Sequence, residues 1–176
     1  MIFERSPFFL DSWPFIVSLN IFNKSKKKYV HNCGGSIINK YQVISAAHCF
    51  RRSKNPRDWI VIAGRNNIYM PKLHKGRVEG RRFKAIKTLE NVVGPKEIIL
   101  HGGYRSVRFV NDVAIVNLKQ PLKLTEKPMG SIKLALQPPK GSEKCRVAGW
   151  GSTSRDTKTS KSYPYKLHEA SVHMRN

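Results

Sequence analysis

The chain has 176 residues, of which 40% are hydrophobic and 10% aromatic, enough apolar material for one globular domain or two small ones. Its 33 lysine and arginine residues outnumber its 11 aspartate and glutamate residues, so the formal net charge is +22. No apolar run approaches the roughly 18 residues of a membrane-spanning helix, which excludes a transmembrane helix.

Short apolar runs separated by turn residues dominate the first two thirds of the chain. The first, residues 13–22, alternates apolar with small or polar residues, as a half-buried strand does. The strands expected in this part cover residues 13–22, 29–39, 42–45, 59–64, 83–93, 97–104 and 113–118, with 83–93 as an outer strand. Strands at this spacing predict an all-β fold with a closed antiparallel barrel.

The remainder of the chain differs in composition. Residues 122–140 are rich in proline and lysine and predict a connector with little regular structure. Two further strands are expected, within Cys145–Gly151 and Leu167–Val172. We expect residues 152–166, between them, to be poorly packed.

A strand, a turn, a second strand and one helical turn are expected between Gly34 and Cys49, and the helical turn presents His48. Cys33 stands just before this stretch and Cys49 ends it. A bond between the two cysteines would close a loop of about 15 residues, worth roughly 3 kcal/mol in the chain-entropy model. The scattered histidines and cysteines show no metal-ligand spacing, so we expect no metal and no cofactor.

The segments His31–Ile38 and Val43–Cys49 together closely resemble the histidine region of the trypsin-like (chymotrypsin-fold) serine proteases. The resemblance implies that His48 is the catalytic general base and that Cys33 and Cys49 form a disulfide. Asn111–Leu118 looks like the family's aspartate motif, which makes Asp112 the carboxylate that orients the histidine. His31 matches a position that is often histidine in the family, where a structural role is expected.

The segment Cys145–Gly151 resembles the early strand of the family's second barrel. The resemblance implies two domains: residues 1–121 as a first, six-stranded antiparallel barrel with His48 and Asp112, and residues 122–176 as a connector and an incomplete second barrel. In the family the cysteine at this point pairs with one much further along, so Cys145 is expected to be unpaired here. A buried free thiol is the alternative.

The nucleophile of such a protease is not evident in this sequence. The family's serine lies in a Gly-Asp-Ser-Gly-Gly segment, and this chain has no glycine after Gly151. Its late serines, none in such a setting, are Ser152, Ser154, Ser160, Ser162 and Ser171. The resemblance implies a serine endopeptidase acting on proteins or peptides through an acyl-enzyme, whereas the chain as given is expected to be inactive, as a fragment, a truncated product or a pseudoprotease.

The charge of +22 allows two interpretations. One is a solvated, repulsive surface, and the other is binding to sulfated glycans or another polyanion, which would make the chain a non-catalytic binding homologue. Nucleic acid is disfavoured because no recognised nucleic-acid module accompanies the charge. The first residues lack a secretory signal pattern, although the resemblance implies a secreted or granule-stored protein.

Overall fold

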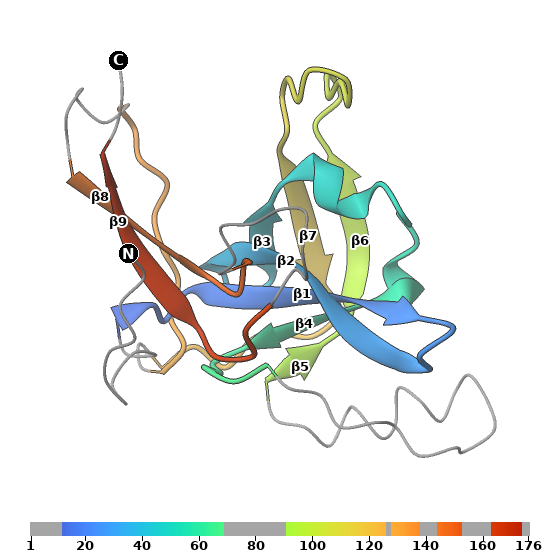
Figure 1. Ribbon diagram of the computed structural model, residues 1–176, viewed down its shortest axis with the longest axis horizontal. Helices are drawn as coiled ribbons and strands as arrows, with labels where there is room; N and C mark the ends of the chain where they lie inside the picture. The colour runs from blue at the N-terminus through green and yellow to red at the C-terminus, as the bar shows by residue number, and fades with distance from the viewer. Residues whose placement is uncertain (1–11, 69–90, 126–127, 138–143, 153–162, 174–176) are drawn as a thin grey trace.

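The computed structural model describes residues 12–68, 91–125, 128–137, 144–152 and 163–173 (Figure 1). Its strands form a seven-stranded sheet with the order β5-β4-β1-β2-β3-β7-β6 and a separate two-stranded sheet, β8-β9. All the recorded strand pairs are antiparallel, and the all-β fold is confirmed. Among the described residues, no helix has the length and apolar character to cross a lipid bilayer.

The elements follow the predicted runs closely. The strands are β1 (Ile16–Asn23), β2 (Lys28–Asn39), β3 (Gln42–Ser45), β4 (Trp59–Ala63), β5 (Val92–Val93), β6 (Pro95–Leu100), β7 (Ala114–Leu118), β8 (Lys144–Gly149) and β9 (His168–His173). Two short 3-10 helices, η1 (Ala47–Phe50) and η2 (Pro56–Asp58), lie between β3 and β4. The described residues of the predicted connector contain no strand or helix.

The large sheet closes on itself as a barrel. Its two outermost strands, β5 and β6, are separated in the sequence by Gly94 alone. β5 pairs with β4 and β6 pairs with β7, so one continuous segment joins both ends of the sheet. Counted in this way, six segments of chain form the barrel, as the sequence predicted, and no long edge remains open.

One predicted strand in this region ends earlier than expected, and another lies mostly outside the described residues. The run predicted for residues 97–104 leaves the sheet at Leu100, because the flexible Gly102 and Gly103 let the chain turn, and the Tyr104 N–H donates to the His101 carbonyl at 2.9 Å. Most of the predicted strand 83–93 lies outside the described residues, and its last two residues form β5.

The barrel encloses the main hydrophobic core. Strand β7 shows the alternation directly: Ala114, Val116 and Leu118 are buried, and the residues between them are half-buried. The largest fully buried apolar side chains of this core are Trp59, Phe50, Leu19, Ile37, Val17, Val43, Val61 and Val116. Burying each aliphatic or aromatic side chain contributes roughly 1.5–3 kcal/mol, which makes this core the main source of stability.

Glycine is required where β2 crosses over the barrel interior. A Cβ atom on Gly35 would lie 2.8 Å from Cγ1 of Val43 and 3.0 Å from the carbonyl oxygen of Ile44. A side chain at this position would therefore force the packed valine or the backbone of β3 to shift. The Cys-Gly-Gly sequence therefore allows β2 and β3 to approach closely just before the chain reaches His48.

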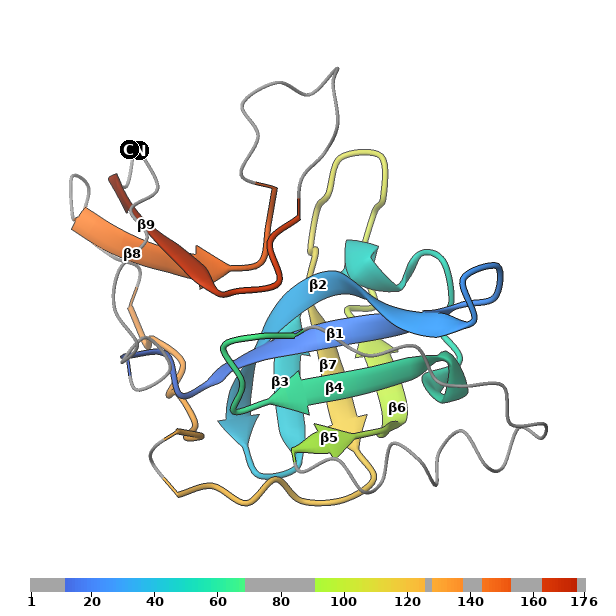
Figure 2. The same ribbon diagram turned by 60° about the horizontal axis from the view of Figure 1, so that its bottom comes forward.

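The β8-β9 sheet lies beside the barrel and is attached through a small second core (Figure 2). Trp150 is 1% exposed and packs with Ile16, Ile68 and Leu167, and its indole N–H donates to the Asn66 carbonyl at 3.0 Å. Much of the two strands faces solvent, with Val147 49% exposed. Of the region expected to pack poorly, residues 153–162 lie outside the described residues, and Tyr163 and Tyr165 are exposed.

Candidate active site

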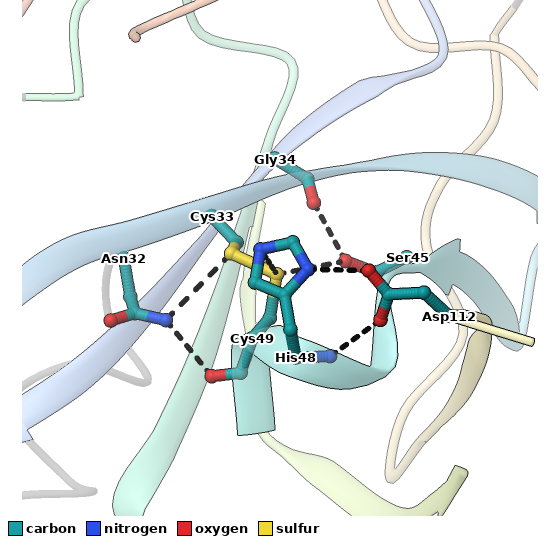
Figure 3. A network of polar contacts seen from close by, with 7 residues as sticks. All are labelled: Asn32, Cys33, Gly34, Ser45, His48, Cys49 and Asp112. Carbon is teal, nitrogen blue, oxygen red and sulfur yellow. Dashed lines mark hydrogen bonds and ion pairs between the residues drawn. A yellow bond between two sulfur atoms is a disulfide. The ribbon is translucent and has the colours of Figure 1, made fainter. Parts of the chain in front are cut away.

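His48 is held in place by the elements on both sides of it. It lies on η1, directly after β3, and its neighbour Cys49 forms a disulfide with Cys33 of β2 across a Cα–Cα distance of 6.0 Å (Figure 3). The Asn32 side-chain amide donates to the Cys49 carbonyl at 3.0 Å. The helical turn that carries the imidazole is therefore fastened to β2 by one covalent bond and one hydrogen bond.

Asp112 reaches His48 because of the pairing between β3 and β7. Ser45, the last residue of β3, pairs with Ala114, the first residue of β7. The chain that follows β3 and the chain that precedes β7 therefore lie close together, which brings His48 to Asp112. Oδ1 of Asp112 accepts the backbone N–H of His48 at 2.7 Å, and Oδ2 lies 2.7 Å from Nδ1 of the imidazole.

This two-point contact determines which ring nitrogen carries the proton. An ionised carboxylate can only accept hydrogen bonds, so Nδ1 must donate to Asp112. The other nitrogen, Nε2, is then left with its lone pair and can take a proton from a neighbouring group. Nε2 lies 3.7 Å from Sγ of Cys49, and the His48 side chain is 44% exposed.

The environment of Asp112 favours the ionised carboxylate. Desolvation acts to raise its pKa, but the hydrogen bonds from the ring and the backbone of His48, its charge, and a hydrogen bond from the Ala47 backbone outweigh desolvation. The pKa of Asp112 therefore lies below its ordinary value. The carboxylate stays charged and able to orient the imidazole at neutral pH.

Phe109 is a neighbour of His48 that the sequence analysis did not identify. Its ring meets the imidazole edge to face at a centroid distance of 5.8 Å, and the side chain is 54% exposed. Phe109 has a φ of 51°, in the left-handed region that is uncommon for a bulky residue. A phenylalanine three positions before Asp112 carries no motif, so nothing in the sequence marked it.

His31, expected to be structural, lies apart from this pair in the contact between the two sheets. Nδ1 of His31 lies 2.7 Å from Oγ of Ser18, and its ring meets that of Trp150 at 5.8 Å. Burial lowers the pKa of His31 to about 4, so the ring is neutral at pH 7. Beside it, a cleft of about 510 Å³ is lined by residues including Cys33, Arg52 and Trp150.

The remaining predicted residues are not part of this arrangement. Among the described residues, no hydroxyl group forms a hydrogen bond with His48, and Cys145, on β8, has a free thiol. Ser154, Ser160 and Ser162 lie outside the described residues. Cys33, His48 and Cys49 bring potential metal-binding atoms within 4.8 Å of one another, but both sulfurs are bonded to each other and are not available as thiolates.

Comparisons with known proteins identify the family to which this chain is similar. The family model described as Trypsin matches residues 2–176. Trypsin zeta of Drosophila erecta is 33% identical over 124 residues, which cover 70% of this chain and 38% of that protein.

A solved structure titled "Structure of GrC" superposes with a TM-score of 0.72 at 22% identity, covering 99% of this chain and 65% of that one, which supports the fold alone. This chain therefore spans under two thirds of the length of both matched proteins. Because the family model covers nearly every residue, the chain belongs to the trypsin family of serine proteases.

Proposed function

We propose that this chain provides the proton-transfer half of a serine endopeptidase site, with His48 as the general base and Asp112 as the residue that orients it. The observation that supports this most strongly is the two-point contact of Asp112 with His48, through the backbone N–H and through Nδ1. A carboxylate placed in this way fixes the imidazole tautomer and stabilises the imidazolium that forms during acyl transfer.

In the proposed reaction, Nε2 of His48 removes a proton from a serine hydroxyl as its oxygen attacks the peptide carbonyl. The imidazolium then protonates the leaving amine, and water hydrolyses the acyl-enzyme by the same proton path. The 176 residues contain no Gly-Asp-Ser-Gly-Gly segment to supply this serine and the oxyanion-stabilising N–H groups beside it. We therefore propose that these 176 residues alone do not hydrolyse peptides.

A fluorophosphonate probe, which phosphonylates an activated serine with loss of fluoride, tests the second part of this proposal. We expect no covalent labelling of the purified 176-residue chain in intact-mass spectra. A stoichiometric adduct on any serine of this chain would contradict the proposal. Sequencing the coding region downstream of Asn176 tests the first part, because a Gly-Asp-Ser-Gly-Gly segment in frame there would supply the nucleophile.

Proton NMR can test the contact between His48 and Asp112 without any catalytic activity. A proton on Nδ1 shared with a carboxylate at 2.7 Å should give a strongly downfield signal, which Asp112→Asn should abolish. Asp58→Asn is the matched control, because the Asp58 carboxylate accepts from Ser53 instead. Persistence of the signal in Asp112→Asn would rule out the proposed orienting role.

A second candidate function is non-catalytic binding of a sulfated glycan or another polyanion, supported by the net charge of +22. We expect the chain to elute from immobilised heparin at a clearly higher NaCl concentration than from a sulfonate cation exchanger of equal charge density. Equal elution positions would show general charge attraction only and would contradict this candidate.

Domain organisation and cellular compartment are also proposed. We infer that residues 1–121 form the first barrel, that residues 122–176 form a connector and an incomplete second barrel, and that the chain is secreted or stored in granules, where an oxidising environment maintains the Cys33–Cys49 disulfide. Limited proteolysis should cut first after the barrel and leave a core near residues 10–121. The native protein should have one titratable thiol per chain, from Cys145, and a count of three would contradict the oxidised state.

A further inference from the structure

We propose that the tip of the β1-β2 hairpin and the loop that leads into β4 together form one binding surface for a sulfated polysaccharide. This proposal rests on the second candidate function and locates it in the fold. The residues of this surface, called the basic tip below, are Lys24, Lys26, Lys27, Lys28, Lys54 and Arg57.

Strand register brings the two halves of the basic tip together. Ile21 of β1 pairs with Trp59 of β4, and the strands are antiparallel. The chain that continues from Ile21 into the hairpin turn therefore runs beside the chain that precedes Trp59, where Arg57 lies on η2. Figures 1 and 2 both show the hairpin tip and η2 at the same end of the barrel. Two clusters about thirty residues apart in the sequence thus form a single patch.

The charges of the basic tip are exposed and are not neutralised by described neighbours. Lys28 is half-buried, and the other five cations are exposed. None of the six forms an ion pair with a described residue. The acidic residue nearest in sequence, Asp58, accepts a hydrogen bond from Ser53 at 2.6 Å instead. Six cations at one end of the barrel thus present a concentrated positive field to solvent.

One cation of the basic tip, Lys27, lies in an unfavourable backbone conformation in the hairpin turn. Lys27 has a φ of 50°, in the left-handed region where hairpin turns usually place glycine or asparagine. The turn is otherwise well formed, because Oδ1 of Asn23 accepts from Oγ of Ser25 and from the backbone N–H of Lys26, both at 2.8 Å. Lysine here is explained by its charge rather than by its fit to the turn.

The chemistry of the basic tip favours a sulfated polysaccharide over a nucleic acid. Single-stranded nucleic acids are bound on exposed aromatic rings that stack with the bases. The aromatic residues near the tip offer no such platform: Tyr29 is 5% exposed, Trp59 is 1% exposed, and Phe22 is half-buried. Five of the six cations are lysines, which act as point charges toward dispersed sulfate groups. A flexible polyanion without bases fits this surface.

Three variants test the proposal on the 176-residue chain, with heparin oligosaccharides as the probe, and the control removes as many charges as the hairpin variant. The hairpin variant is Lys24→Gln/Lys26→Gln/Lys27→Gln, and the loop variant is Lys54→Gln/Arg57→Gln. The control variant is Lys40→Gln/Lys123→Gln/Lys133→Gln, whose lysines are also exposed. Lys40 follows the far end of β2, up to roughly 40 Å along the chain from Lys28 at about 3.3 Å per residue.

We expect calorimetric titrations at several NaCl concentrations to give at least a tenfold weaker Kd for the hairpin variant. The slope of log Kd against log salt should fall by about two to three units, because each cation removed releases about one counterion fewer. For the loop variant the slope of log Kd against log salt should fall by about two units. The control variant should lose little heparin affinity. Equal losses of heparin affinity in the hairpin and control variants would contradict the basic tip as the binding surface, while polyanion binding by the chain would still stand. A wild-type chain that does not bind heparin would overturn both.

Two further measurements test the details. Lys27→Gly should keep or raise the thermal midpoint, since glycine accepts a positive φ freely, and should still weaken heparin binding by about two- to threefold. Unchanged affinity would show that the charge at this position is unimportant. A single-stranded DNA oligonucleotide of equal charge should bind more weakly than heparin, and tighter DNA binding would contradict the choice of a polysaccharide.

Discussion

The barrel and the β8-β9 sheet both consist of antiparallel strands, but only the barrel encloses a large hydrophobic core. In the barrel, every residue of β4 is buried, and the sheet leaves no long edge unpaired. In the small sheet, β8 and β9 pair only with each other, and none of their residues is fully buried. Two strands alone cannot form a core, so β8-β9 depends on its contact with the barrel through Trp150.

This difference shows that strand pairing alone does not determine local stability. Both sheets are antiparallel, and the register between β8 and β9 runs without interruption over six residue pairs, whereas the β1-β2, β2-β3 and β6-β7 registers of the barrel each shift once. The barrel adds a closed apolar interior, whereas the small sheet exposes both faces. We therefore expect the barrel to set the global free energy of unfolding and β8-β9 to open at lower cost. Four predictions test this contrast.

The largest effect is expected from Trp59→Ala in the barrel core. Trp59 is 1% exposed, packs against Phe50 at a centroid distance of 4.9 Å, and donates to the Ser53 carbonyl at 3.0 Å. Loss of this packing should lower the free energy of unfolding by about 3–5 kcal/mol in urea titrations. A loss below about 1 kcal/mol would mean that the barrel core does not dominate stability.

Removing the disulfide should have the next largest effect. The bond joins residues 16 positions apart, so Cys33→Ala/Cys49→Ala should cost about 3 kcal/mol on the chain-entropy model. Cys145→Ala is the control, because that thiol is free on the small sheet and should leave the urea midpoint nearly unchanged. Equal shifts of the urea midpoint in the two variants would show that the disulfide in the barrel contributes no more to stability than the thiol on the small sheet.

Acid should weaken the contact between the sheets through His31. Its folded pKa of about 4 is below the unfolded value of 6.5, so the unfolded chain binds more protons between these pH values. The contribution of neutral His31 to the free energy of unfolding is therefore complete above pH 6.5. As the pH falls toward 4, up to roughly 2–3 kcal/mol of this contribution is lost. His31→Gln should flatten this slope in unfolding free energies measured from pH 4 to 7, whereas the exposed His101→Gln should keep it.

The smallest effect is expected on the small sheet itself. Val147 is 49% exposed, so Val147→Ser should change the unfolding free energy by less than about 0.5 kcal/mol. Hydrogen exchange should nevertheless show the amides of β8 and β9 exchanging well before those of β1 and β4. Protection of β8-β9 equal to that of the barrel would show that the two sheets open as one unit.

The parts of this molecule that could be predicted from sequence are those carried by local patterns. Alternating apolar residues predicted the strands, and the segment around His48 identified the family. The resemblance of Asn111–Leu118 to the family's aspartate motif indicated Asp112 as the expected partner of His48. These features depend on residue types within short windows, where periodicity and motif spacing are informative.

The features missed by the sequence depend on contacts between distant segments. The pairing of β1 with β4 places Arg57 beside the hairpin lysines, and no local pattern encodes that register. The contact between His31 and Trp150 likewise joins residues more than one hundred positions apart. The turn at His101–Tyr104 is an exception, because its hydrogen bond is local. It was predicted as strand because the apolar run before it suggested that the strand continued.

The single-residue step at Gly94 has a consequence for biosynthesis. Because the segment around Gly94 joins both ends of the large sheet, every strand of the barrel is available once Leu118 has left the ribosome. Synthesis from the N-terminus can then deliver a finished barrel while later residues are still being translated, and His48 would meet Asp112 at that moment. The histidine–aspartate pair would thus be assembled early, on the nascent chain.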